Sequence, residues 1–198
     1  GSINFVRSLR DMLAGASRSS VNMTVKWDGA PAIFAGIDPE DGQFFVAKKS
    51  VFNVNPKLYK SASEVDADVS GALNSKFKTA LAEFSKLGIK GVLQGDLMFT
   101  DDVSTETIDG KSYLTFQPNT IVYAVDVNSD LGKKIKNAKI GVVWHTTYSG
   151  KTLQDMKASF GANISGLQKP STVWMDDATY KDVSGSATMT AAETEKVT

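Results

Sequence analysis

The chain has 198 residues, of which 41% are hydrophobic, and its 22 basic and 22 acidic side chains give a formal net charge of zero. This composition is typical of a globular domain with a core of its own and excludes a chain coated in basic residues. The sequence has no cysteine, which excludes disulfides and a cysteine nucleophile, and no apolar run reaches the roughly 20 residues of a membrane span.

The first half of the chain predicts a helix, a group of strands and a second helix. Residues 1–20 are expected to form a helix and a linker, and "VNMTVKW", "AIFAGI" and "QFFVAKK" then predict strands, with "DPEDG" as a hairpin turn. The polar stretch "NVNPKLYKSASEVDADVSG" is interpreted as a surface loop. The second helix follows, with Gly88 as its C-terminal stop and an apolar face made of Leu73, Phe77, Leu81 and Phe84.

The second half predicts mainly strands, in "GVLQGDLMF", "SYLTF", "TIVYAVDV", "IGVVWHTTY" and "STVWM". "IDGKS" predicts a hairpin turn and "TLQDMKASFG" a short helix. The order of elements indicates an α+β fold with a largely antiparallel sheet, in one domain over 21–185. Thr190 and Glu193 match the T-x-x-E capping box, so residues 186–198 are expected to start a following helix, in a chain that is an N-terminal piece of a longer one.

The stretch "TVKWDGAPAIFAG", residues 24–36, contains the first candidate for chemistry. On a strand, Lys26 and Asp28 point to one face, and Gly29 ends the strand in a tight turn. Partial desolvation favours the neutral amine, which is a competent nucleophile, whereas the nearby carboxylate favours the charged form. Taken alone, K-x-D-G is equally compatible with a solvated lysine on a surface strand.

Three further segments follow this lysine in order. "FFVAKKSVF" carries Lys48 and Lys49 at a strand end, "GVLQGDLMF" carries Asp96, and "TIVYAVD" carries Tyr123. In this order the segments resemble the motifs of the covalent nucleotidyltransferases, the superfamily of ATP-dependent DNA and RNA ligases and mRNA-capping enzymes. The strings "KWDGAPAIFAGIDP" and "KIGVVWHTTYSG" are also similar to uncharacterised ligase-like proteins of tailed bacteriophages.

The resemblance implies a ligase adenylation-domain fold and a covalent mechanism. Lys26 would attack the α-phosphate of ATP, displace pyrophosphate and form a lysyl-AMP, with Asp28 and Gly29 completing the nucleotide-binding motif. The AMP would then pass to a nucleic acid, and RNA or DNA ends would be sealed. Because the sequence has neither a membrane-span pattern nor a signal-peptide pattern, the chain is expected to be cytoplasmic, in the host cytoplasm if it is viral, with no membrane partner.

The same resemblance implies how the nucleotide is held. Lys48 and Lys49 would neutralise phosphate charge in the transition state. Asp96 would accept hydrogen bonds from the ribose hydroxyls, and Tyr123 would stack on adenine. Mg²⁺ would bridge the phosphates, with protein ligands that the sequence does not identify and with Asp126 as a weak candidate.

Other residues allow simpler interpretations. Lys133, Lys134 and Lys136 in "LGKKIKNAK" could contact the phosphate backbone of a nucleic acid or could belong to a solvated loop. His145, the one histidine, is expected to have a hydrogen-bonded structural role. The tryptophans are expected to pack in or beside the core.

Departures from the motif pattern keep several functions open. Pro31 stands where many nucleotidyltransferases carry an arginine. The nearest candidate for motif IV, "KIGVV", has Ile140 in place of the glutamate and follows motif IIIa too soon, so it is rejected, and no K-x-K strand matches motif V. The chain could therefore be an inactive nucleotide- or nucleic-acid-binding module of the same fold. It could also be a GTP-using, capping-type guanylyltransferase, or a structural or assembly protein in which K-x-D-G is a coincidence.

Overall fold

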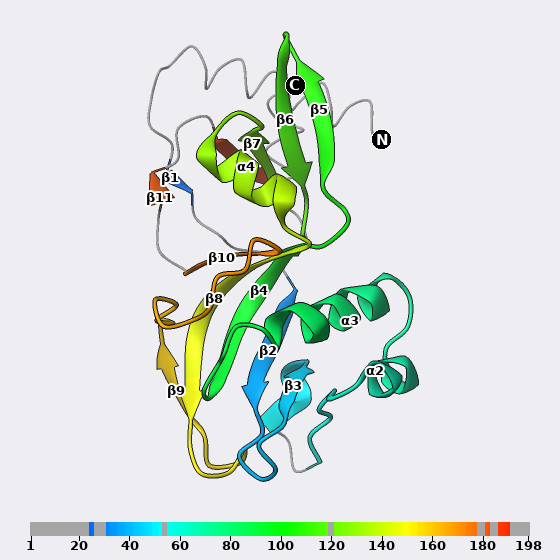
Figure 1. The fold of residues 1–198 in the computed structure, drawn as a ribbon, viewed down its shortest axis with the longest axis vertical. Helices are drawn as coiled ribbons and strands as arrows, with labels where there is room; N and C mark the ends of the chain where they lie inside the picture. The colour runs from blue at the N-terminus through cyan, green and yellow to red at the C-terminus, as the bar shows by residue number, and fades with distance from the viewer. Residues whose placement is uncertain are drawn as a thin grey trace. The chain divides into compact units, whose positions relative to one another are not determined.

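The structure is a computed structural model that describes residues 24–25, 31–52, 55–118, 121–177, 181–182 and 186–190. The helix expected over 1–20, together with Lys26, Asp28 and Gly29, lies outside these residues. Within them the fold is α+β with mostly antiparallel sheets, as the order of predicted elements indicates (Figure 1).

The chain divides into two compact units instead of the single domain expected over 21–185. The α3 unit contains the described residues of 31–100 and 138–177, and the β7 unit contains the remaining described residues. The division arises because residues 101–137 leave the first sheet and add their strands to a separate one.

The α3 unit is built on one sheet with the strand order β10-β8-β4-β2-β3. Its neighbouring strands are antiparallel except for β10, which runs parallel to β8, and β9 pairs with β8 off this path. The strands are β2 (Ala32–Ile37), β3 (Phe44–Ala47), β4 (Val92–Phe99), β8 (Ile140–Ser149), β9 (Lys157–Phe160) and β10 (Val173–Asp177).

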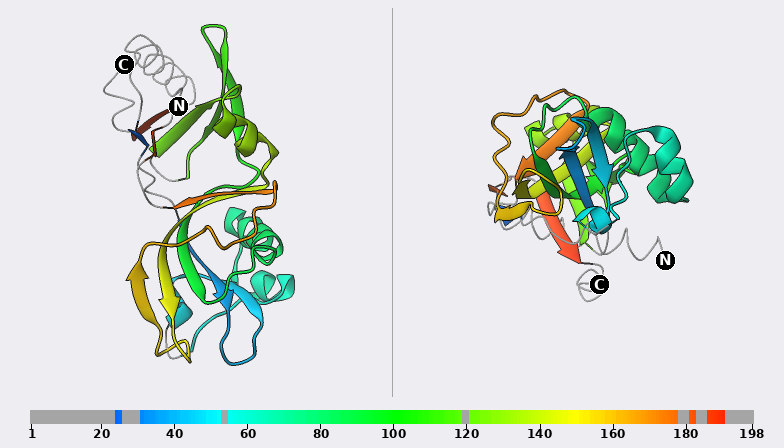
Figure 2. Two further views of the ribbon diagram at one scale, coloured as in Figure 1. Left: turned by 60° about the vertical axis from the view of Figure 1, so that its left-hand side comes forward. Right: turned by 90° about the horizontal axis from the view of Figure 1, so that it is seen from below.

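Two helices, α2 (Ala62–Asp68) and α3 (Ala72–Phe84), lie on the same side of this sheet (Figure 2). The expected apolar face of α3 is confirmed, since Phe77 and Phe84 are buried in one cluster with Leu93, Leu97 and Trp144 of the sheet. The helix ends earlier than expected, at Phe84 with Ser85 as its C-cap, and Gly88, with a φ of 73°, belongs to the turn that follows. The helices therefore cover one face of the sheet with the main hydrophobic core.

Two expectations for the α3 unit are wrong. The stretch interpreted as a surface loop contains α2, because Ser61 caps the helix by accepting a hydrogen bond from the Glu64 backbone N–H at 3.3 Å and donating one to the Glu64 carboxylate at 3.2 Å. The stretch "TLQDMKASFG", expected to be a short helix, holds a turn and then β9, because its second half pairs with β8.

The β7 unit contains a four-stranded antiparallel sheet of order β12-β7-β6-β5 and a short pair β1·β11. The positive φ angles of Asp109 (52°) and Gly110 (80°) form the turn expected at "IDGKS". The elements are β1 (Thr24–Val25), β5 (Ser104–Ile108), β6 (Lys111–Phe116), β7 (Ile121–Asp126), α4 (Asp130–Asn137), β11 (Lys181–Asp182) and β12 (Ser186–Thr190).

Two segments of the β7 unit differ from expectation. Residues 186–190, expected to lead into a helix, form β12, because they pair with β7; residues 191–198 lie outside the described residues. The lysine-rich segment considered as a loop forms α4, whose first turn is stabilised when the Ser129 hydroxyl accepts a hydrogen bond from the Gly132 N–H at 3.0 Å.

Glu83 is a buried carboxylate that ties α3 to the segment before β10. It is 5% exposed and accepts hydrogen bonds from Lys86 Nζ at 2.9 Å and Thr172 Oγ1 at 2.8 Å. Burial alone would raise the pKa of Glu83, but these two donors outweigh it and the pKa is lowered. The ionised carboxylate is therefore the stabilising form.

We expect Glu83→Gln to lower the free energy of unfolding at neutral pH by about 1 to 3 kcal/mol, because it removes charge-assisted hydrogen bonds from a buried site. Since the folded-state pKa lies below the unfolded value, the wild-type advantage is full above the reference value of 4.5 and is lost as the pH falls through the folded-state pKa. Chemical denaturation from pH 7 to pH 3 measures this difference. Glu40→Gln, at an exposed turn residue, is the control and should change little.

Candidate functional site

The face of the α3-unit sheet opposite α2 and α3 carries a group of polar side chains. Along β4, Leu93 and Leu97 join the core under the helices, so the alternating residues Gln94 and Asp96 lie on the other face. The cross-strand partner of Asp96 on β2 is Ala32, and its partner on β8 is Val143. Small and apolar neighbours thus flank the Asp96 carboxylate on both sides.

A β-bulge in β8 brings a histidine to this carboxylate. Gln94 pairs with Thr146 and Gly95 pairs with Trp144, so His145 is the extra residue between them. His145 Nε2 lies 3.5 Å from Asp96 Oδ1, and His145 Nδ1 is 2.7 Å from the Thr146 hydroxyl. The side chains of Asp96 and His145 are 21% and 23% exposed, which leaves them accessible from solvent.

Gly95 makes this arrangement possible. A Cβ at this position would lie 2.6 Å from the Val143 carbonyl oxygen and 2.8 Å from the Trp144 ring. Both contacts are far shorter than van der Waals distance, and the first involves backbone that cannot rotate away. The glycine before Asp96 is therefore required by the close approach of β8.

Aromatic side chains lie beside the polar group. The Tyr148 hydroxyl donates to Gln94 Oε1 at 2.7 Å, and its ring centroid lies 4.5 Å from that of Phe52 and 5.8 Å from that of Phe34. Burial raises the pKa of Tyr148, so the hydroxyl remains a donor. This contact fixes the orientation of Gln94 next to Asp96.

The two lysines expected to contact phosphate differ in their surroundings. Lys48 directly follows β3 and is half-buried, and its charge helps to lower the pKa of Asp68, although the hydrogen bond from Lys57 is the largest cause. Lys49 is exposed and begins the 3₁₀ turn η1 (Lys49–Phe52), which packs through Val51 on the Asp96 side of the sheet. Lys49 is therefore the better placed of the two to meet an anion on that face.

The expected purine platform and the expected nucleic-acid contacts belong to the β7 unit. Tyr123 is 1% exposed and stacks on Phe116 at a centroid distance of 5.3 Å, so its ring packs as a core side chain. Lys133, Lys134 and Lys136 are exposed on α4, whose Ile135 is buried. On the Asp96 face of the other sheet, the aromatic side chains are Phe34, Phe52 and Tyr148, which contact one another.

The described residues do not form a metal site by themselves. No group of three or more His, Cys, Asp or Glu side chains among them could hold a metal ion. Asp126, the weak candidate, forms an ion pair with Lys111 at 3.1 Å and accepts a hydrogen bond from the Asn128 N–H in a turn before α4. Because Mg²⁺ at nucleotide sites is held by one or two carboxylates and by phosphates, these residues fit only an ion that the nucleotide itself helps to hold.

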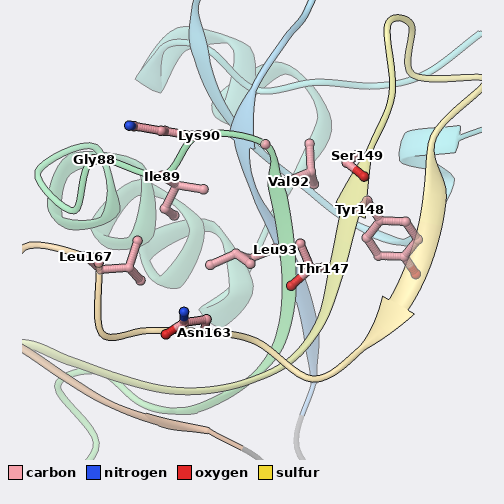
Figure 3. Close-up of a pocket in the computed structure, with 12 residues that line it drawn as sticks. Gly88, Ile89, Lys90, Val92, Leu93, Thr147, Tyr148, Ser149, Asn163 and Leu167 are labelled. Atoms are coloured by element: carbon pink, nitrogen blue, oxygen red, sulfur yellow. The ribbon is translucent and has the colours of Figure 1, made fainter.

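A cavity of about 330 Å³ in the α3 unit shares Tyr148 with this polar group but not Asp96 or His145 (Figure 3). Ile89, Leu93 and Leu167 point toward its interior, whereas Lys90, the charged residue of its lining, extends away from them. Its lining offers apolar contact and few polar groups. We therefore take the polar group around Asp96, not this cavity, as the candidate functional site.

Sequence reasoning identified Asp96 but not the residues around it. Gln94, Thr146 and Tyr148 were not singled out, and His145 was expected only to have a structural role. The only sequence signals were the two predicted strands themselves, "GVLQGDLMF" for Gln94 and "IGVVWHTTY" for the other three residues. Nothing local indicates that β8 pairs with β4 or that a bulge interrupts it.

None of the helices in the described ranges is long and apolar enough to cross a membrane.

The fold and this site define the chain as an α+β protein with a polar group on one open sheet face. All of its residues, 1–198, match the model of a family described as "Family of unknown function (DUF6267)", and the chain belongs to this family. No curated protein and no solved structure matches the chain.

We expect Gly95→Ala to lower the free energy of unfolding by about 1 to 3 kcal/mol, because the added methyl group is overpacked against β8. Gly166→Ala is the matched control, since nothing lies within 4 Å of a Cβ at that exposed position. Thermal and chemical denaturation of both variants measure the difference. Equal stability of the two would show that β8 tolerates a side chain at position 95.

Proposed function

We propose that the chain is the adenylation part of an ATP-dependent, polynucleotide ligase-like nucleotidyltransferase. The observation that carries the proposal is the pairing of β2 with the G-D-L segment of β4. The Pro31 carbonyl accepts a hydrogen bond from the Leu97 N–H at 2.8 Å, and the next residue, Ala32, pairs with Asp96. The strand that begins six residues after Lys26 in the sequence thus lies directly beside Asp96.

The short stretch of chain between Lys26 and β2 also supports the proposal. Only residues 27–31 separate Lys26 from Ala32, and six steps of extended chain span at most ~22 Å. This length is the upper limit on the distance between Lys26 and the β2 residue that pairs with Asp96. The same hydrogen bond gives Pro31 a structural role at the position where many nucleotidyltransferases have an arginine.

In the proposed reaction the neutral amine of Lys26 attacks the α-phosphorus of ATP. A P–N bond forms, the P–O bond to pyrophosphate breaks, and the amine releases its proton to solvent. Asp96 accepts hydrogen bonds from the ribose hydroxyls, and Lys49 stabilises charge on the phosphates. Mg²⁺ bound with ATP would supply further neutralisation of that charge.

The proposed product, lysyl-AMP, is an activated phosphoryl donor. The AMP passes to a 5′-phosphate of RNA or DNA, and a 3′-hydroxyl then displaces it and seals the ends. The exposed lysines of α4, at positions 133, 134 and 136, are proposed to contact the phosphate backbone. A capping-type reaction with GTP would use the same lysine.

We expect the wild-type chain with Mg²⁺ and α-labelled ATP to form a labelled adduct that survives denaturation, and Lys26→Ala to form none, because the nucleophile is lost. Intact-mass spectrometry should show one added AMP. Lys151→Ala, at an exposed lysine after β8, is the control and should label like the wild type.

The same assay separates the alternatives. A wild-type chain that never labels but is stabilised against thermal unfolding by ATP would be a binding module, and the covalent proposal would be wrong. Labelling of Lys26→Ala at the wild-type level would also contradict it. Stronger labelling with α-labelled GTP than with ATP would favour the guanylyltransferase.

We further expect Lys49→Ala to slow adduct formation more than Lys48→Ala. Lys49 is exposed on the turn that packs on the Asp96 side of the sheet, whereas the charge of Lys48 acts on Asp68. Single-turnover labelling rates at saturating ATP compare the two variants. A larger loss for Lys48→Ala would reverse the assignment of the phosphate contact.

A further inference from the structure

We propose that His145 is a positioning residue that holds the Asp96 carboxylate in the orientation needed to bind the ribose hydroxyls of the nucleotide. The inference deepens the proposed function and rests on it. It goes beyond the motif resemblance, which assigns no role to β8, and beyond the packing role expected for a lone histidine.

The bulge in β8 determines which residues of this strand face Asp96. Ile140, Val142 and Trp144 belong to the core under the helices, so His145 falls on the opposite face by simple alternation. In a regular strand Thr146 would then return to the core face. Because the bulge pairs Thr146 with Gln94, two consecutive residues, His145 and Thr146, lie on the Asp96 face.

This placement gives both ring nitrogens of His145 a partner. Nδ1 is 2.7 Å from Thr146 Oγ1, which leaves Nε2 to face Asp96 Oδ1 at 3.5 Å. The second distance is within ion-pair range and longer than a normal hydrogen bond. A ring held at one nitrogen can orient a carboxylate through the other, as outer partners do for ligand groups in many sites.

The carboxylate itself has the exposure that the role requires. Asp96 is 21% exposed, and among the described residues Oδ2 has no hydrogen-bond partner, so the face away from His145 can accept a ligand hydroxyl. A carboxylate with two equivalent free oxygens would rotate about its last bond. Contact with Nε2 removes that freedom and lowers the entropic cost of binding.

Two amide substitutions distinguish the contact that Nε2 makes with Asp96 from the contact that Nδ1 makes with Thr146. His145→Gln puts a side-chain NH₂ near the position of Nε2 and keeps a donor toward Asp96, whereas His145→Asn puts one near Nδ1 and keeps only the contact with Thr146. We expect His145→Asn and His145→Ala to raise the ATP KM for adduct formation roughly tenfold to a hundredfold. His145→Gln should remain within about threefold of the wild type, and the maximal rate should change least, because the ribose contact is made equally in the ground and transition states.

A double-mutant cycle tests that the effect passes through Asp96. If His145 acts by orienting that carboxylate, His145→Asn should raise the KM no further in an Asp96→Asn background. A histidine that merely stabilised the fold would give additive losses in both backgrounds. Its Gln and Asn variants would also lose activity together.

The single histidine of the chain provides a measurement that needs no nucleotide. In protein without a histidine tag, the imidazole ¹⁵N signals belong to His145 alone. Asp96→Asn should shift them, and Glu40→Gln, in the exposed turn beyond the opposite end of β2 from the residue that pairs with Asp96, should not.

The results of these experiments distinguish a failure of the role proposed for His145 from a failure of the proposed function. Unchanged imidazole signals in Asp96→Asn, or equal KM values for His145→Gln and His145→Asn, would overturn the role of His145 while leaving the labelling of Lys26 intact. A wild-type chain that forms no adduct would overturn the proposed function, and the ribose role of Asp96 and His145 with it.

Discussion

The pairing of β4 with β8 is the contact on which the rest of the α3 unit depends. It brings Leu93 and Leu97 beside Val142 and Trp144, and these side chains form the sheet half of the core that α3 covers. The same pairing brings His145 and Thr146 beside Asp96 and Gln94 on the other face. Gly95 permits the close approach of the two strands, so one glycine serves the core and the polar face together.

One face of the sheet holds the apolar core, and the other face holds the polar candidate site. On the helix side, burial of large apolar side chains supplies the favourable free energy of folding. On the other side, Asp96 and His145 keep part of their surface in water and contact each other, so neither pays the full cost of an isolated buried charge. On the helix side, the buried carboxylate of Glu83 instead accepts hydrogen bonds from Lys86 and Thr172.

Local patterns predicted the elements that depend on local physics. The apolar face of α3, the turn at Gly110 and the strand around Asp96 could be read from spacing and turn chemistry. The capping-box pattern of Ser61 and Glu64 also indicates the start of α2, but the polar composition of this stretch led to its interpretation as a loop. The contact of His145 with Asp96 could not be predicted, because it depends on a bulge and on the pairing of strands far apart in sequence. The burial of Tyr123 depends on tertiary packing in the same way.

The route of the chain through the α3 unit has a consequence for folding. β2, β3 and β4 are made first, but β4 finds its partner β8 only after the residues of β5, β6, β7 and α4 have been made. Until then one edge of β4 has unpaired backbone groups, and pairing across such a long separation carries a large loop-closure cost. On a ribosome, the polar group around Asp96 is thus completed only after β8 has emerged. A nascent chain that stops before residue 140 lacks β8, and therefore has neither the complete sheet nor the site.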